Sequence, residues 1–269
     1  MQIALFNDED IAPIVLPDGI DYRCAGVDAV LQELTQTGTR AKLVYADPPW
    51  VYSQAPGFSA DPACHYKQLT DADIANHLRD AHAVGATHSR LLVWCTWPKL
   101  GEFWEQFNTG KPWRYVSGGS WHKHGGRGGV GYHWLGKSEP ALLYKKGSPA
   151  CRWNNFTNAH NSKPGLHSVK PVDFLIGMLQ RWTDPGDLVV DLYAGLGSMA
   201  LACHRTGRRY IGAEIDKKRH QEGLQWLHAR NCGQQRETVW EPQNTDESRA
   251  SEPINSEKNT ATNGLLLRA

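Results

Sequence analysis

The stretch Asp187-Leu-Val-Val-Asp-Leu-Tyr-Ala-Gly195-Leu-Gly197-Ser-Met-Ala200 contains the strongest local signal for how this chain folds. It predicts a buried strand over 188–192, a glycine turn and a helix over about 198–205. A further strand over 209–213 then ends at Glu214. Glycines at a strand-to-helix turn let a ligand approach the backbone, and an acid at the end of the next strand can accept hydrogen bonds from ribose hydroxyls. The stretch therefore predicts an α/β fold with a cofactor at the glycine turn.

The same turn also fits the dinucleotide fingerprint, since Gly195-x-Gly197-x-x-Ala200 is followed by Glu214. A nicotinamide-dependent oxidoreductase is therefore a rival interpretation. The turn lies late in the chain, however, with little more than one βαβ unit after it, whereas a dinucleotide site needs two mononucleotide halves. An oxidoreductase also has no use for the motif at residues 47–50.

This motif, Asp47-Pro48-Pro49-Trp50, follows the apolar run 42–46. Proline has no backbone N–H and a fixed φ, so the pair turns the chain out of the sheet and exposes a carbonyl. A carboxylate, a carbonyl and a flat ring then lie at the C-terminal end of a strand. This group suits a planar base with an exocyclic amine, because it offers two acceptors and a ring for stacking. An ordinary strand-to-loop turn capped by an aromatic residue is the alternative.

A third segment contains Lys170, which precedes Pro171 at the start of an amphipathic helix. The apolar side of this helix consists of Phe174, Leu175, Met178, Leu179 and Trp182. A lysine at this position could meet a ligand carboxylate, and an ordinary surface lysine is the alternative.

Together the three segments resemble the permuted, beta-class amino-methyltransferases that use S-adenosylmethionine, in which the catalytic motif comes first and the glycine motif last. The catalytic motif ends in tryptophan here, and this version of the motif is most similar to that of the N6-adenine branch, which includes the mRNA adenosine methyltransferases. The glycine motif departs mildly from the family pattern: it reads Asp-Leu-Tyr-Ala-Gly-Leu-Gly-Ser where the family often has Asp-Pro-Phe-Ala-Gly-Ser-Gly-Thr. The pieces that carry the resemblance are Ala46–Trp50, Gly131–Gly147, His167–Pro171, Gly186–Ser198 and Gly207–Glu214.

The resemblance spans roughly residues 20 to 230 and implies a Rossmann-like methyltransferase fold, a mainly parallel sheet with helices on both faces. It implies that Asp47 and the Pro48 carbonyl accept hydrogen bonds from the two N–H groups of the target amine while Trp50 stacks on the base. The implied catalytic residues are Asp47, Pro48, Pro49 and Trp50. The implied contacts to S-adenosyl-L-methionine are Cys24, Ala25, Asp47, His167, Ser168, Lys170, Asp191, Tyr193, Gly195, Gly197 and Glu214.

The function that the resemblance implies is methylation of adenine N6 in DNA, on a base flipped out of the duplex. RNA adenosine is an alternative substrate, because that branch shares the tryptophan motif. Cytosine N4 is another, although the cytosine branch usually has serine where Asp47 stands. A non-catalytic nucleic-acid-binding partner would be expected to lose the acid or the glycines, and both are intact here.

Basic residues are concentrated in the middle of the chain. Between Lys111 and Lys170 there are ten Lys and Arg and a single acid, Glu139, although the net charge is only +1. Such a distribution is typical of a nucleic-acid surface. The segment 118–131 is so rich in glycine that we expect a mobile loop there, which either orders over DNA or only connects its flanks. The expected nucleic-acid contacts are Lys123, Arg127, Tyr132, His133 and Trp134.

The histidines in this region match no common metal site, so we expect no metal. With 269 residues, of which 40% are hydrophobic, the chain can form one large methyltransferase domain over 1–236, with the basic region of about 111–165 inserted. The polar tail 237–269 is expected to be disordered. The six scattered cysteines and the lack of a long apolar run favour a cytoplasmic protein without disulfides or a membrane span. The sequence leaves the oligomeric state open, a homodimer included.

Other periodic segments complete the predicted fold. Residues 1–20 are expected to be irregular. Helices are predicted at 28–35, 71–84 and 100–107, the last with Trp104 and Phe107 on its apolar face, and strands at 42–46, 91–96, 113–121 and 140–145.

Overall fold

The computed structural model describes residues 14–51, 68–108, 112–125, 136–152, 157–162 and 169–230. All of them belong to one structural unit, Met1–Glu237. The second unit, Thr238–Ala269, lies outside the described residues, so the disordered tail stays a prediction.

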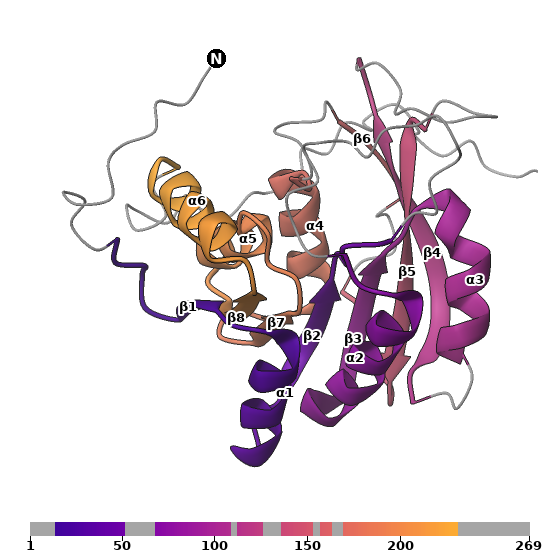
Figure 1. The fold of residues 1–269 in the computed structure, drawn as a ribbon, viewed down its shortest axis with the longest axis horizontal. Coiled ribbons are helices and arrows are strands. Elements are labelled where there is room, and N and C mark those ends of the chain that lie inside the picture. The colour runs from indigo at the N-terminus through magenta and orange to yellow at the C-terminus, as the bar shows by residue number, and fades with distance from the viewer. Residues whose placement is uncertain are drawn as a thin grey trace, which may run out of the picture. The chain divides into compact units, whose positions relative to one another are not determined.

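One eight-stranded sheet forms the centre of this unit, in the order β1-β8-β7-β2-β3-β5-β4-β6 (Figure 1). Neighbours from β1 to β3 in this order are parallel, β5 is antiparallel to both β3 and β4, and β6 is parallel to β4. The sheet is thus mainly parallel, which confirms that part of the predicted fold. The strands are β1 (Ile20–Cys24), β2 (Ala41–Ala46), β3 (Gly85–Trp94), β4 (Arg114–Lys123), β5 (Ser138–Lys146), β6 (Ala159–Ser162), β7 (Leu188–Asp191) and β8 (Arg209–Glu214).

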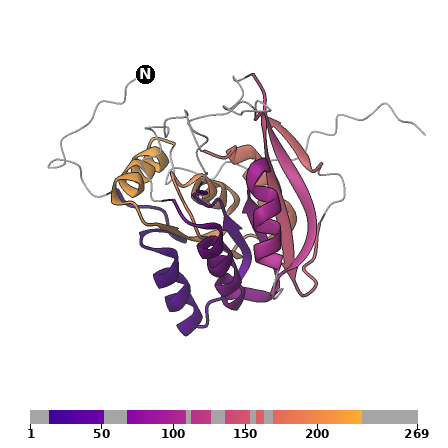
Figure 2. The ribbon, with the colours of Figure 1, turned by 45° about the vertical axis from the view of Figure 1, so that its right-hand side comes forward.

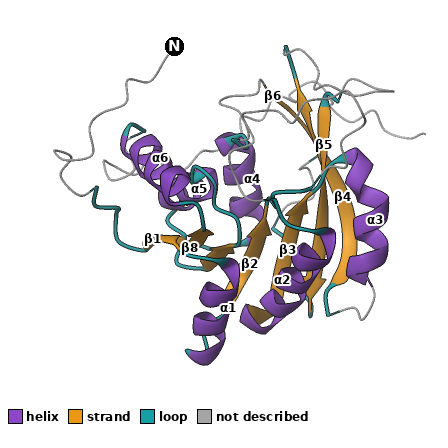
Figure 3. Cartoon of the chain, in the orientation of Figure 1, coloured by secondary structure: helices purple, strands orange, loops and turns teal. Residues whose placement is uncertain are grey.

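Helices cover both faces of the sheet, as predicted (Figures 2 and 3). Alternate residues of β2 point to opposite faces, so Val44 belongs to one core cluster while Leu43 and Tyr45 belong to the other. The first cluster packs under α1 (Val27–Gln36), α2 (Asp71–Val84) and α3 (Trp97–Asn108). The second packs under α4 (Val172–Trp182), α5 (Ser198–Thr206) and α6 (Lys217–His228).

Local signals explain why several elements begin where the sequence predicts. Helix α2 starts after Thr70, whose hydroxyl accepts from the Asp73 N–H at 3.1 Å, while the Asp73 carboxylate accepts from the Thr70 N–H at 3.3 Å. This reciprocal capping box satisfies two backbone donors that the first helical turn leaves without partners. The last four residues of strand β2, Leu43 to Ala46, are apolar and all buried, as is usual for a parallel strand covered on both faces.

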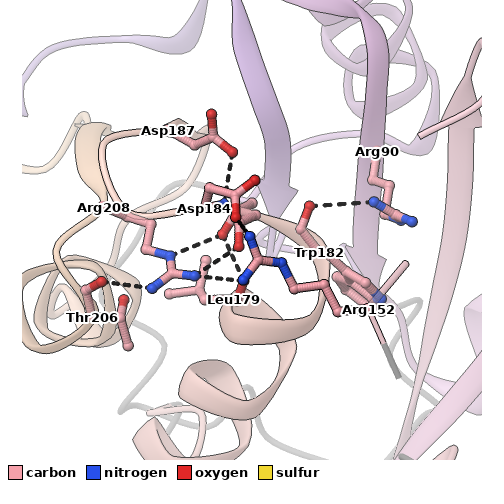
Figure 4. A network of polar contacts seen from close by, with 9 residues as sticks. Arg90, Arg152, Leu179, Trp182, Asp184, Asp187, Thr206 and Arg208 are labelled. Atoms are coloured by element: carbon pink, nitrogen blue, oxygen red, sulfur yellow. Dashed lines mark hydrogen bonds and ion pairs between the residues drawn. The ribbon is translucent and has the colours of Figure 1, made fainter. Parts of the chain in front are cut away.

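The C-terminal end of α4 is held by two buried arginines from outside the helix, Arg90 of β3 and Arg208, which precedes β8 (Figure 4). Arg208 donates to the carbonyls of Thr183 at 2.7 Å and Leu179 at 3.4 Å, and Arg90 of β3 donates to the carbonyl of Trp182 at 3.3 Å. The last carbonyls of a helix carry partial negative charge, so these three contacts stabilise this end. They fix the helix that follows Lys170.

Two predictions about the basic region and its neighbour are wrong. The strand predicted over 113–121 continues as β4 to Lys123, so residues 118–123 are not part of the glycine-rich loop expected over 118–131. The glycines are tolerated because another backbone approaches closely: a Cβ at Gly119 would lie 3.0 Å from the Asn158 carbonyl oxygen. In α3, Phe103 and Phe107 are buried but Trp104 is 38% exposed, so the predicted apolar face is rotated.

Other elements were not predicted or were predicted too short. Strands β1 and β6 and helix α6 had no prediction, and β3 begins at Gly85 rather than near Leu91. No helix in the described part of the chain is long and apolar enough to cross a membrane.

Candidate active site

The aspartate motif and the glycine turn follow neighbouring parallel strands. In the register of β2 and β7, Tyr45 lies opposite Asp191, so both strands end at the same edge of the sheet. Asp47 follows β2 and Tyr193 follows β7, and both side chains line one cavity of about 650 Å³ at this edge. Ligands of open α/β sheets usually bind at the carboxyl ends of the strands. The fold thus brings together two motifs that are far apart in the sequence.

A row of side chains with alternating charges leads away from Asp47. The Nζ of Lys170 lies 2.5 Å from Asp47 Oδ2 and 3.2 Å from Glu139 Oε2, and Glu139 also pairs with Lys123. The side chain of Lys170 is only 6% exposed, and its ammonium lies 5.1 Å from the ring centroid of Trp94. An ammonium has three N–H donors, so the two carboxylates leave it one further donor for a ligand.

The pKa values of the ion-paired residues in this row follow from burial and charge. Burial raises the pKa of Asp47, Lys170 lowers it and Glu139 raises it, and the net shift is upward. Burial also raises the pKa of Glu139, but Lys170 and Lys123 outweigh burial and hold it below its usual value. For Lys170, burial lowers the pKa, yet Asp47 and Glu139 raise it above normal. Lys170 is therefore charged, Glu139 is a carboxylate, and Asp47 is the acid closer to taking up a proton.

The two prolines present their carbonyls in different ways. The Pro48 carbonyl accepts from the Trp50 N–H at 3.0 Å, and the Pro49 carbonyl accepts from the Leu69 N–H at 3.0 Å. A carbonyl oxygen has two lone pairs, so Pro48 keeps one acceptor position. The Trp50 ring lines the cavity but is 5% exposed, and its edge packs on Phe103 with ring centroids 5.1 Å apart.

The glycine turn needs glycine at both positions, for different reasons. Gly195 has φ +54° and a Cβ there would meet no atom within 4 Å, which leaves the backbone open to a ligand. Gly197 has φ +83°, and its Cβ would lie 3.0 Å from the side chain of Leu227. Below the turn, buried Asp191 accepts from the Tyr193 N–H at 3.2 Å and from the hydroxyl of Tyr210 at 3.1 Å. Burial raises the pKa of Asp191 to about 8.

Glu214 links the glycine turn to the end of β8. Its Oε2 accepts from the Gly195 N–H at 3.1 Å and its Oε1 from the Asp216 N–H at 2.9 Å. Its backbone carbonyl accepts from the Ala25 N–H at 2.9 Å. Each carboxylate oxygen can accept a second hydrogen bond, so these contacts orient the side chain without using all of its acceptor positions.

The structure brings nine of the predicted site residues to the cavity wall: Ala25, Asp47, Pro48, Pro49, Trp50, Lys170, Tyr193, Gly195 and Glu214. Cys24, Asp191 and Gly197 do not line it, and Lys123 is joined to it through Glu139. The remaining predicted contacts lie outside the described residues: Arg127, Tyr132, His133, Trp134, His167 and Ser168. Within the described residues, no group of three or more His, Cys, Asp or Glu is placed to hold a metal ion.

Sequence reasoning missed three residues that line the cavity. Glu139 pairs with Lys170, and the only signal for it was its position as the single acid among ten bases. His77 and Asp28 form the other group: His77 Nε2 lies 3.1 Å from Asp28 Oδ1, and its Nδ1 lies 2.8 Å from the hydroxyl of Tyr193. Nothing in the sequence pointed to this pair, because three separate elements have to meet before it forms.

Known proteins share parts of this chain. The model of the DNA methylase family, N6_N4_Mtase, matches residues 98–225, which include Glu139, Lys170 and the glycine turn but not Asp47. Escherichia coli (strain K12) has a similar protein, named "Putative methylase YubD", that is 36% identical over 95 residues. This match covers 35% of the present chain and 40% of that protein.

Solved structures are similar over most of the chain. The M1.HpyAVI–SAM complex superimposes with a TM-score of 0.60 at 16% sequence identity, covering 77% of this chain and 98% of that one. PvuII DNA methyltransferase, which is cytosine-N4-specific, gives a TM-score of 0.55 at 10% identity and covers 75% of this chain and 84% of that one. At these identities the likeness concerns the fold. The chain therefore has the α/β fold of these solved proteins, PvuII DNA methyltransferase among them, and the DNA methylase family model matches the part that contains its glycine turn.

Proposed function

We propose that this protein is a DNA methyltransferase that transfers the methyl group of S-adenosyl-L-methionine to the N6 amine of adenine. One observation carries the proposal: the carboxylate of Asp47 and the glycine turn at Gly195 open onto the same cavity. A volume of about 650 Å³ is within the usual range of small-molecule sites. The match to the DNA methylase family supports the same class of reaction.

The residues at the turn fit S-adenosyl-L-methionine. The open backbone at Gly195 can approach the methionine part, the acceptor positions left on Glu214 suit the ribose hydroxyls, and the third donor of Lys170 suits the carboxylate. Ala25 and Tyr193 line the same wall. When bound, the cofactor supplies a methyl group on a positively charged sulfur.

The aspartate motif can activate an aromatic amine. The lone pair of such an amine is delocalised into the ring, which makes the nitrogen a poor nucleophile. When Asp47 and the Pro48 carbonyl accept hydrogen bonds from its two N–H groups, the nitrogen moves towards tetrahedral geometry and its lone pair becomes available. Once the nitrogen has gained the methyl group it releases one proton, which Asp47 is placed to accept. Trp50, rigid against Phe103, is the wall on which the base would lie. Holding both reactants in line provides most of the rate enhancement in such a mechanism.

The substrate class follows from charge and from the acid. The basic region between Lys111 and Lys170 favours a polyanion, and flipping a base out of a duplex costs a few kcal/mol that backbone contacts can offset. An aspartate at position 47, where cytosine enzymes usually have serine, favours adenine. Cytosine N4 is the second candidate, since PvuII methyltransferase shares the fold.

The test is to incubate the protein with methyl-labelled cofactor and with DNA, RNA or neither, and then to digest the products to nucleosides. We expect label in N6-methyldeoxyadenosine and none without nucleic acid. Label in N4-methyldeoxycytidine, or in RNA alone, would correct the substrate. Absence of transfer, combined with tight binding of NAD in a calorimetric titration, would favour the oxidoreductase instead.

A further inference from the structure

Trp97 is exposed to an unusual degree at the rim of the cavity. Its side chain is 53% exposed, although an exposed tryptophan loses the free energy that burial of its ring would provide. Single exposed apolar residues are common, but here the neighbouring residue Thr96 lines the cavity itself. The position of Trp97, rather than its exposure alone, therefore calls for an explanation.

The ring of Trp97 is held in one orientation from below. Its indole N–H donates to the hydroxyl of Ser138 at 2.9 Å. Ser138 is the first residue of β5 and precedes Glu139, which also lines the cavity. Because β5 runs antiparallel to β3, its beginning lies beside the end of β3, at the same edge as Asp47. The only polar atom of the indole is thus satisfied by the protein, and what remains for a ligand is an apolar π surface.

We propose that Trp97 stacks on a nucleobase that adjoins the methylated base on the target strand. This inference rests on the proposed function and adds a subsite to it. Aromatic side chains bind unpaired bases by stacking, and the face of every base can take part. A base flipped into the cavity leaves its neighbour at the rim, where the anchored ring lies.

Charge near the ring supports a nucleic acid as the occupant. Lys137, directly before Ser138, is exposed, and Lys123 donates its backbone N–H to the Lys137 carbonyl at 2.7 Å. The Ser138 hydroxyl that anchors the ring thus directly follows an exposed lysine, Lys137, within the region of ten bases and one acid. A cation next to an aromatic ring provides both the phosphate contact and the stacking surface that a single strand needs.

A matched control is available on the same helix. Trp104 lies seven residues further along α3, about 10 Å from Trp97 along the axis, and is 38% exposed. Its ring already packs edge-on against Tyr115, with centroids 4.6 Å apart. Trp97→Ala should raise both the Kd for a target oligonucleotide and the KM for it by about 5- to 100-fold, which corresponds to the loss of one stacking contact. Trp104→Ala should change neither more than about twofold, and Trp97→Phe should restore most of the loss.

The decisive experiment combines the variant with a modified substrate. Binding is measured by fluorescence anisotropy with S-adenosylhomocysteine present, on an oligonucleotide that carries an abasic site next to the methylated base. If Trp97 stacks there, the abasic site should weaken binding to the wild type, and Trp97→Ala should then add nothing further. Equal losses for Trp97→Ala on intact and abasic oligonucleotides would overturn the inference.

Two further measurements separate this inference from the others. Methyl transfer by the wild type with an unchanged Kd for Trp97→Ala would leave the proposed function intact and remove the subsite. A wild type that neither binds nor methylates nucleic acid would overturn both. Sedimentation of both tryptophan variants tests a second copy of the chain as occupant: a change of oligomeric state for Trp97→Ala, without a change in nucleic-acid affinity, would assign the ring to a protein interface.

Discussion

At the scale of single residues, the site depends on how one buried lysine divides its contacts. Lys170 touches Asp47 and Glu139 at once, so the lysine couples the aspartate motif to the beginning of strand β5. Removing either acid leaves the other with the whole positive charge, and removing the lysine leaves two carboxylates close together. Loss of Glu139 should therefore lower the pKa of Asp47, and loss of Lys170 should raise it.

Asp47→Asn should abolish methyl transfer, because the amide retains the shape of the side chain but presents an N–H₂ as well as a carbonyl to the amine. The affinity for S-adenosylhomocysteine, measured by calorimetry, should stay within a few fold, since Gly195 and Glu214 are untouched. Asp80→Asn, an exposed change on α2, is the control and should behave like the wild type. Substantial activity in Asp47→Asn would refute the role of Asp47 as an acceptor.

The pH dependence of transfer should depend on Glu139. Asp47 must be ionised to accept from the amine, so the rate should fall as the pH falls through its pKa, which burial has raised. Glu139 raises this pKa further, and Glu139→Gln should therefore move the acid limb of the kcat profile to lower pH. Glu102→Gln, an exposed partner of Lys99, should leave the limb in place. An acid limb that stays at the same pH or moves to higher pH in Glu139→Gln would contradict the coupling.

At the scale of elements, a series of glycine substitutions separates backbone strain from packing. Gly101 lies in α3 with negative φ and free space, so Gly101→Ala should stabilise the fold by about 0.5–1 kcal/mol. Gly38 has φ +68° and equally free space, so alanine there should cost roughly 1–2 kcal/mol of strain. Gly197→Ala adds the contact with Leu227 and should cost most. Thermal unfolding should rank the Tm values in this order; a Gly197→Ala protein as stable as Gly38→Ala would show that Leu227 moves aside.

The elements that the sequence predicted are those whose signals are local. The capping box at Thr70 and the apolar run of β2 are complete within a few residues, and α2 and β2 lie where expected. The glycines of β4 suggested a loop because the reason for them, the backbone at Asn158, comes 39 residues later. The pairing of Lys170 with Glu139 and the contact of His77 with Tyr193 were hidden for the same reason: each exists only once distant elements have packed.

At the scale of the whole molecule, basic and acidic residues are distributed unevenly along the sheet. The half that contains β4 and β5 belongs to the basic region, and the half with the glycine turn belongs to the more acidic remainder of the chain. Association with DNA should therefore depend strongly on salt, because each neutralised phosphate releases counterions.

Replacing Lys123 and Arg127 by alanine should weaken DNA binding and reduce the slope of log affinity against log salt by about 2. Replacing Arg40 and Lys42, an exposed Arg and Lys at the start of β2 and thus at the opposite edge of the sheet, is the matched control. Anisotropy titrations on duplex DNA, single-stranded DNA and RNA would give the slopes. Identical slopes for the two double variants would exclude Lys123 and Arg127 from the interface.

The alternation of charge from Lys123 through Glu139 and Lys170 to Asp47 also limits how the protein can evolve. The four charges cancel, so any single neutral replacement leaves one unbalanced charge in a largely buried group. A descendant that exchanges Lys170 has to pass through a form with two facing carboxylates, unless Glu139 is replaced first. Replacing Glu139 first leaves Lys170 paired with Asp47 and frees Lys123. The accessible mutational paths therefore begin at Glu139 and reach Asp47 last.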